Sequence, residues 1–247
     1  MVHFQAAPSS RTGNTHRPIG RGSVGLFLFI FISLPSLAFK AMIFNFIVSV
    51  PPVTRVLLAL GVVSIVLVTF DLVHPVQMIF SPTLIFQERQ YWRLVLTFLY
   101  YGRLSLNSIF ELHWLYVVSS SIEVQYFHWR RWDYCFTLFV TAALLVLMRT
   151  VRLLEAPYLS LSFGKSLMYL FGRLLPDEEV VLFGLVTLQV RLLPLVLFLI
   201  GICLSGLSSV KGDMLAYLVG HVLWYFLEIF PRITSIHPLR IQEHFAR

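Results

Sequence analysis

Long apolar runs separated by short polar segments are the feature that most restricts how this chain can fold. Six of them follow one another: Val56–Leu72, Leu106–Ile122, Tyr134–Met148, Pro157–Leu175, Val186–Leu207 and Met214–Phe230. A helix of about 20 apolar residues crosses the hydrocarbon of a bilayer, because all its backbone groups are satisfied within the segment. The sequence therefore predicts an all-α polytopic membrane protein with six transmembrane helices.

The composition supports the bilayer as solvent and excludes several classes of function. Hydrophobic residues make up 57% of the chain and charged residues 13%, roughly half the charge usual in soluble domains. Cys135 and Cys203 both lie in apolar runs, so neither a disulfide framework nor a metal site is predicted. The sequence carries no nucleotide-binding motif, and no cofactor is expected. The net charge of +7 is scattered between the runs, which favours membrane lipids over nucleic acid as a partner.

The first 41 residues differ in character from the rest. Residues 1–23 are polar and predict disorder, whereas residues 25–39 form a short apolar segment that ends in small residues. Three interpretations stay open for residues 1–41: a secretory signal, an extra membrane anchor, or sequence upstream of a true start at Met42. We expect the membrane domain to cover residues 42–231 and a short tail to cover residues 232–247.

Polar and ionisable residues interrupt the apolar runs. Asn107 and Glu111 are four residues apart and share one helix face, Lys165 lies in the fourth run, and Gln189 and Arg191 lie in the fifth. A charge at the centre of a membrane helix is unfavourable by about 2.5–3.5 kcal/mol, so each needs a partner or water. Either these residues pair internally and fix the helix register, or they line a wet cavity open to one side of the membrane.

The sixth run carries a stripe of small residues. Gly212, Ala216 and Gly220 follow one another at intervals of four, which predicts close approach of a neighbouring helix. Packing within the bundle is favoured over dimerisation, and the adjacent His221 is interpreted as a structural partner of a polar group. We therefore expect this helix to be central.

Four motifs, in order along the chain, resemble the derlin family. They are VSVPPVTR at 48–55, QYWRL at 90–94, FGL at 183–185 with Gln189 and Leu193-Pro194, and GHVLWYFLEIFP at 220–231. Residues 133–177 match only in their pattern of polar and apolar residues. The resemblance implies a rhomboid-like bundle of six helices in the endoplasmic reticulum membrane, with both termini in the cytosol.

The function implied by this resemblance is non-catalytic. Derlins help to recognise misfolded luminal or membrane proteins and to move them to the cytosol for ubiquitination and proteasomal degradation. The implied partners are these substrates, a membrane ubiquitin ligase with an adaptor bearing a ubiquitin-like domain, and indirectly a cytosolic AAA ATPase. We expect the substrate route and its loop to involve Trp92, Arg93, Asn107, Glu111, Gln189 and Arg191.

Trp92 and Arg93 stand where the first loop meets the membrane. An indole ring and a guanidinium both suit the membrane interface, so an ordinary anchor is one interpretation. The other is that Arg93, which can donate several hydrogen bonds, holds the loop in shape through its carbonyl groups.

Rhomboid proteases, which derlins resemble, use a serine in a Gly-x-Ser-Gly turn and a histidine on the sixth helix. Here the turn reads Gly164-Lys165-Ser166-Leu167, and His221 lies on the sixth run. Leucine replaces the last glycine of the turn, so we predict a pseudoprotease in which Ser166 bonds to backbone. An active intramembrane protease and a transporter are the alternatives, although the two halves show no inverted repeat.

Overall fold

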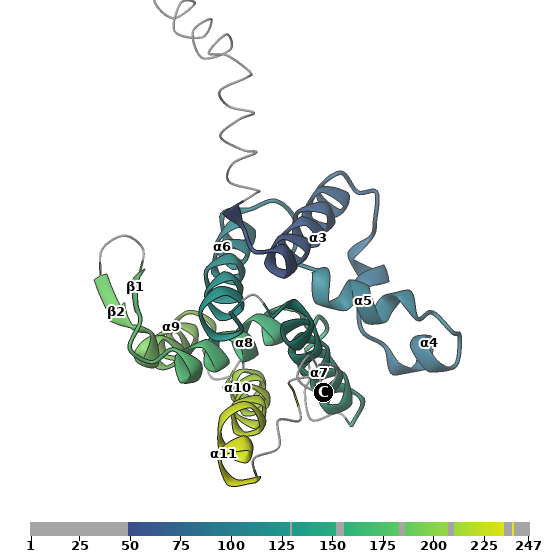
Figure 1. The fold of residues 1–247 in the computed structure, drawn as a ribbon. Helices are drawn as coiled ribbons and strands as arrows, with labels where there is room; N and C mark the ends of the chain where they lie inside the picture. The colour runs from purple at the N-terminus through teal and green to yellow at the C-terminus, as the bar shows by residue number, and fades with distance from the viewer. Residues whose placement is uncertain are drawn as a thin grey trace, which may run out of the picture. The chain divides into compact units, whose positions relative to one another are not determined.

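The computed structural model describes residues 49–128, 130–151, 156–182, 186–206, 210–234 and 239. Most of this chain is helical (Figure 1). The longer helices are α3 (Pro52–Thr69), α5 (Trp92–Leu99), α6 (Leu106–Ser121), α7 (Arg131–Thr150), α8 (Ser160–Leu174), α9 (Leu193–Ser205) and α10 (Val210–Trp224). The short elements are the 3₁₀ turns η1 (Pro75–Met78) and η3 (Val190–Leu192), the helices α4 (Pro82–Phe86) and α11 (Phe230–Thr234), and the π-helical turns η2 (Ile122–Tyr126) and η4 (Tyr225–Ile229). The predicted extension of residues 1–41 and most of the predicted tail lie outside the described residues.

Local chemistry sets the first helix boundaries. Helix α3 begins at Pro52, where a missing backbone N–H is tolerated because the first turn has no acceptor for it. Helix α6 begins after Ser105, whose hydroxyl accepts from the Ser108 backbone N–H while the Ser108 hydroxyl accepts from the Ser105 N–H. This reciprocal capping fixes the start of α6 at the residue that the sequence predicts.

Three helices of the described chain are long and apolar enough to cross a membrane. They are α3, α7 and the continuous helix Val210–Thr234, which joins α10, η4 and α11. Helices α6 and α8 contain 16 and 15 residues, which at 1.5 Å per residue reach only about 24 and 22 Å. Helix α9 belongs to a shorter apolar segment, Val190–Cys203. The chain is a mostly helical membrane protein, and the count of six crossings stays a prediction.

The fifth helix begins later than the sequence predicts. We expected a helix from Val186, but Val186–Gln189 forms strand β2, which pairs antiparallel with β1 (Glu179–Leu182). Helix α9 starts only at Leu193, with Pro194 in its first turn. Valine and threonine favour an extended backbone because their branched side chains restrict χ1 in a helix. The expected helical position of Gln189 is therefore wrong, and this residue ends a strand.

Helix α8 lies at the centre of the bundle, with α6, α7, α9 and α10 around it (Figure 1). Its most extensive packing is against α10. A Cβ atom added to Gly220 of α10 would lie 2.6 Å from the carbonyl oxygen of Ser166 in α8. The backbones of α8 and α10 thus lie so close together at this point that position 220 has no room for a side chain.

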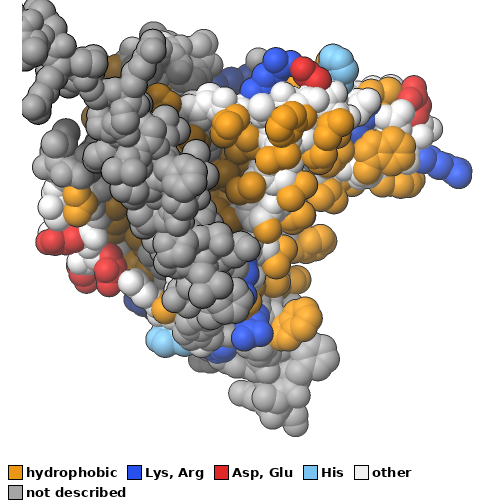
Figure 2. All heavy atoms as spheres, turned by 90° about the horizontal axis from the view of Figure 1, so that it is seen from above, with side chains coloured by type: hydrophobic (Ala, Val, Ile, Leu, Met, Phe, Trp, Pro, Cys, Tyr) orange, Lys and Arg blue, Asp and Glu red, His pale blue; other side chains and the backbone are white. Residues whose placement is uncertain are grey.

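The outer surface of α3, α5 and α7 is apolar. Exposed side chains include Val56 and Val63 on α3, Val95 on α5, and Phe139 and Leu147 on α7. Figure 2 shows hydrophobic side chains gathered in a broad area on one face. A patch of this extent on a helical bundle suits contact with lipid rather than with water.

A buried carboxylate joins α3 to the following pair of helices. Glu123 in η2 accepts hydrogen bonds from the backbone N–H groups of Val53 (3.0 Å) and Thr54 (2.8 Å) and from the Thr54 hydroxyl (2.8 Å). The Thr54 hydroxyl also contacts Ser119 Oγ at 2.8 Å, which lies 2.6 Å from the Tyr134 hydroxyl. The two N–H groups belong to the first turn of α3, so Glu123 caps that helix and complements its dipole.

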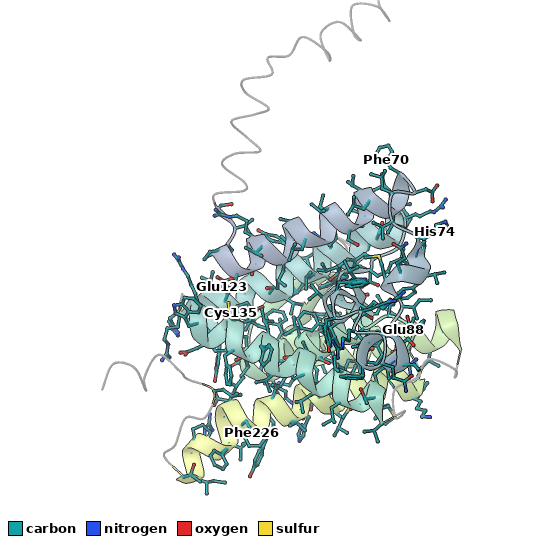
Figure 3. All side chains as sticks on the ribbon, turned by 90° about the vertical axis from the view of Figure 1, so that its right-hand side faces the viewer. Phe70, His74, Glu88, Glu123, Cys135 and Phe226 are labelled. Atoms are coloured by element: carbon teal, nitrogen blue, oxygen red, sulfur yellow. The ribbon has the colours of Figure 1, made fainter. Side chains whose placement is uncertain are left out.

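The bundle has two distinct ends. Figure 3 shows Glu123 and Cys135 at one end and Phe70 and His74 at the other, with α3 running between them. We take these ends as the two membrane interfaces.

Candidate functional site

A cavity of ≈ 370 Å³ lies between α6, α8, α9 and α10. Helix α6 lines it with Asn107 and Glu111, α8 with Lys165, α9 with Gly201, and α10 with Tyr217. Much of the remaining wall is apolar, with Phe110, Trp114, Leu167, Met168, Leu197 and Ile200. Two residues expected on the substrate route, Asn107 and Glu111, therefore share one cavity with a lysine from another helix.

One of the charges at this cavity is paired within the bundle. Lys165 Nζ forms an ion pair with Asp213 Oδ1 of α10, and Asp213 is only 7% exposed. Glu111 is partly buried, and within the described residues it has no hydrogen bond or ion pair. A carboxylate among apolar helices needs water or a polar guest. The cavity therefore contains both an internal ion pair and a carboxylate that can bind water or a polar group of a ligand.

Arg93 joins the start of α5 to the loop that follows α3. Its side chain is almost fully buried, and Nε donates to Gln90 Oε1 at 2.6 Å. One terminal nitrogen donates to the carbonyl oxygens of Val76 at 2.9 Å and Gln77 at 3.0 Å. The preceding Trp92 is 58% exposed. The guanidinium thus organises the backbone of η1, while the indole faces outward as an interfacial ring would.

A second set of contacts ties this loop to the start of α8. Tyr158 stacks on Tyr100, with ring centroids 3.7 Å apart, and its hydroxyl donates to the Pro75 carbonyl at 3.3 Å. Ser160 Oγ donates to the Tyr100 carbonyl at 2.5 Å. Ser160 also lines the cavity, so the start of α8 contacts both the segment after α5 and the cavity.

Ser166 and His221 are not arranged as a catalytic dyad. Ser166 Oγ is buried and lies 2.8 Å from the Ser162 carbonyl oxygen and 2.7 Å from that of Ala216, so its proton is directed to backbone. His221 Nδ1 lies 2.9 Å from the Tyr169 hydroxyl instead. A nucleophilic serine needs an adjacent base and an accessible hydroxyl. This geometry provides neither.

The other predicted residues occupy different places. Gln189 ends β2 and Arg191 lies in η3, and neither lines the cavity around Glu111. In the small-residue stripe of α10, Ala216 and Gly220 are fully buried. Gly212 is partly exposed in the first turn of the same helix. In the described part of the chain, no group of three or more His, Cys, Asp or Glu side chains could hold a metal ion.

Three buried carboxylates were not identified from the sequence as functional or structural: Glu123, Asp133 and Asp213. Asp133 lies 3.9 Å from the Nε atom of Arg130, three residues earlier in the chain. Asp213 could have been found, because Lys165 needed an opposite charge on another run. Glu123 gave no such signal, since its partners are backbone N–H groups that any residue carries.

The family model of the Der1-like family matches residues 50–238. The chain belongs to the Der1-like family. The chain is similar to Derlin-2.2 of Arabidopsis thaliana, with 28% identity over 200 residues that cover 77% of this chain and 81% of the relative. It is also similar to Derlin-1 of Arabidopsis thaliana, with 27% identity over 199 residues (81% and 71%), and to a probable derlin-2 homolog of Dictyostelium discoideum, with 26% identity over 192 residues (76% and 75%).

The part matched to the Der1-like family contains the features described above. It includes the Arg93 loop, the cavity around Glu111 and the contact of Gly220 with Ser166, and it leaves residues 1–41 outside. The resemblance inferred from four motifs is thus confirmed at the level of the family.

Proposed function

We propose that this Der1-like protein is a non-catalytic component of ER-associated degradation. It helps to recognise misfolded luminal or membrane proteins and to move them across the endoplasmic reticulum membrane to the cytosol. Membership of the Der1-like family carries the proposal. In this proposal the fold is a rhomboid-like bundle of six membrane helices with both termini in the cytosol.

The cavity between α6, α8, α9 and α10 supports a role in substrate passage. A polar group of a substrate that enters hydrocarbon without a partner is disfavoured by several kcal/mol. Asn107, Glu111 and Lys165 offer that group hydrogen bonds inside the bundle. The short helices α6 and α8 would also thin the surrounding bilayer, because their length is below its hydrocarbon thickness of about 30 Å.

The loop held by Arg93 would form the luminal mouth of this route. Its guanidinium fixes η1, and the Tyr158 hydroxyl, just before α8, donates to the Pro75 carbonyl of the same turn. Substrates would then meet a preformed opening, which needs less ordering on binding than a mobile loop does.

The proposed process makes and breaks no covalent bond. The buried Ser166 hydroxyl bonds to carbonyl groups and His221 bonds to Tyr169, which supports a pseudoprotease. Its partners would be the misfolded substrates, a membrane ubiquitin ligase with its ubiquitin-like-domain adaptor, membrane lipids, and indirectly a cytosolic AAA ATPase that supplies pulling force.

The proposal is tested by substrate degradation in cells that lack their own derlins. We expect the full chain to restore degradation of a luminal misfolded protein, and Glu111→Leu to slow it while the variant itself reaches normal abundance. Glu179→Gln, which changes an exposed acid on β1, is the matched control and should be fully active. Purification in mild detergent should recover the ubiquitin ligase.

Three results would contradict parts of this proposal. If Glu111→Leu at normal abundance restores substrate degradation completely, the cavity is not part of the substrate route. Substrate fragments that disappear in Ser166→Ala would show proteolysis, and a preparation that never contains the ligase would argue against the degradation pathway.

A further inference from the structure

A second cavity, of ≈ 360 Å³, lies between α8, α9 and α10. Two arginines, Arg173 and Arg191, line it together with the apolar side chains of Leu195, Phe198 and Met214. Glu111, Asn107 and Lys165 do not line it, and it adjoins the cavity proposed above for substrates at Tyr217, which lines both.

Arg173 is held on an aromatic platform. Its guanidinium carbon lies 5.0 Å from the ring centroid of Trp224 and 5.5 Å from that of Tyr169, and its Nε donates to the Tyr169 hydroxyl at 3.1 Å. Among the residues that the structure describes, no carboxylate pairs with Arg173. These contacts hold the guanidinium beside the two rings and leave its two terminal nitrogens able to donate to an anion.

Arg191 is only weakly engaged. Its terminal nitrogen lies 3.4 Å from Asp177 Oδ1, and the two side chains are 61% and 91% exposed. Exposed ion pairs of this kind contribute little to stability. Arg191 can therefore exchange Asp177 for a stronger anionic ligand, or hold both.

Close backbone packing brings the two arginines to one cavity. A Cβ atom on Gly172 would lie 3.0 Å from Pro194 Cγ and 3.1 Å from the Val190 carbonyl oxygen. Arg173 follows Gly172 at the end of α8, and Arg191 follows Val190 just before α9. The contact of these neighbours places both cations at the same end of the helices.

The cavity becomes apolar away from the arginines. Met214 lies ten residues before Trp224 on α10, which is about 15 Å along the helix. Leu195 and Met214 are 56% and 61% exposed, so this part faces the outer surface of the bundle. Two cations at a helix end and an apolar path leading from them match an amphiphile with an anionic head.

We propose that this cavity binds one membrane glycerophospholipid. The phosphate lies between Arg173 and Arg191, and the first part of an acyl chain lies along Leu195, Phe198 and Met214. Arginine suits this ligand because its planar fork donates two parallel hydrogen bonds to phosphate oxygens. The position of both arginines at helix ends corresponds to the level of lipid headgroups. A soluble anion would leave the exposed apolar path uncovered.

Native mass spectrometry of the purified full chain tests the proposal. The probes are phosphatidylserine, diacylglycerol with the same acyl chains, and inorganic phosphate. We expect retention of phosphatidylserine by the wild type and about tenfold less retention by R173Q/R191Q, because two charge-assisted contacts are lost. The control R103Q/R232Q removes the same charge from arginines that pair with Asp71 and Glu228 elsewhere, and should bind as the wild type does.

Several outcomes would overturn the assignment. If diacylglycerol is retained as well as phosphatidylserine, the phosphate does not contribute to binding. If inorganic phosphate binds as tightly as phosphatidylserine, the acyl chain does not contribute. Unchanged lipid retention by R173Q/R191Q would refute the site, and if that variant instead dissociated an oligomer, the cavity would be an interface between copies. Arg191→Glu, on an exposed turn away from the Trp224 stack, repeats the test if the double variant does not fold, and it should also lose the lipid.

Discussion

Gly220 gives the sharpest test of how the bundle is held together. In Gly220→Ala, the added Cβ would lie 2.6 Å from the Ser166 carbonyl oxygen and 3.0 Å from Tyr169 Cβ. The nearest atom belongs to the backbone of the central helix and cannot rotate away. Helix α10 must therefore shift relative to α8, which disturbs the hydrogen bond from Ser166 to the Ala216 carbonyl.

The loss of stability expected in Gly220→Ala can be isolated by comparison with a second glycine. Gly164 lies within helix α8, and a Cβ atom there would meet nothing within 4 Å. Both glycine-to-alanine changes gain the same helix propensity, about 1 kcal/mol, so their difference isolates the steric term. Overpacking is unfavourable by about 1–3 kcal/mol. We expect Gly220→Ala to be less stable than Gly164→Ala by that amount.

The assay is heat-induced loss of the monodisperse peak in mild detergent, with the lifetime of each variant in cells as a second measurement. Gly164→Ala should be as stable as the wild type or more so, whereas Gly220→Ala should melt earlier and be degraded faster. Equal melting temperatures for the two variants would show that α8 and α10 are not in close backbone contact, and the argument for a central α10 would fail.

Three further variants probe individual hydrogen bonds. Arg93→Lys should insert normally yet slow luminal substrate degradation almost as much as Arg93→Ala, because an ammonium group cannot reproduce the planar fork; full activity with lysine would mean that only charge matters. Ser166→Ala loses the hydrogen bonds of the hydroxyl and should be about 1 kcal/mol less stable. Substrate turnover in a pulse-chase experiment should not change. Loss of turnover at normal abundance of the variant would instead support serine catalysis. Glu123→Ala leaves the buried Thr54 N–H and the partly buried Val53 N–H without their acceptor, and the buried group alone costs about 1–3 kcal/mol. The melting temperature of this variant should therefore drop, with Glu123→Gln intermediate, and an unchanged value would refute the capping role.

The helices with sustained apolar character could be predicted from the sequence. Helix α6 starts at the predicted Leu106, after Ser105, whereas α3 starts at Pro52, four residues before the predicted Val56. The start of the fifth run, from Val186 to Leu192, misled the prediction, because a short, mostly apolar stretch is compatible with both a helix and a strand. Its pairing, Val180 with Leu188 and Val181 with Thr187, depends on contacts that periodicity does not encode.

The site could be predicted only in part. Glu111 and Asn107 share a helix face by spacing alone, and the structure puts both on one cavity. The partners of Arg93 are carbonyl groups 16 and 17 residues earlier, and carbonyl groups have no residue type by which a pattern could single them out. Gln189 and Arg191 were grouped with Glu111 because all three were expected inside membrane helices. The later start of α9 leaves Gln189 on a strand and Arg191 in a 3₁₀ turn.

The cap on α3 has a consequence for the order in which the chain assembles. Glu123 follows Val53 by 70 residues, so at about 5–20 residues per second of synthesis the first helix waits roughly 4–14 s for the carboxylate that completes it. During that interval the N–H groups of its first turn must be bonded to water or to other proteins at the site of insertion. A nascent chain arrested before Glu123 should therefore hold α3 loosely, and release of η2 into the membrane should be the event that locks it.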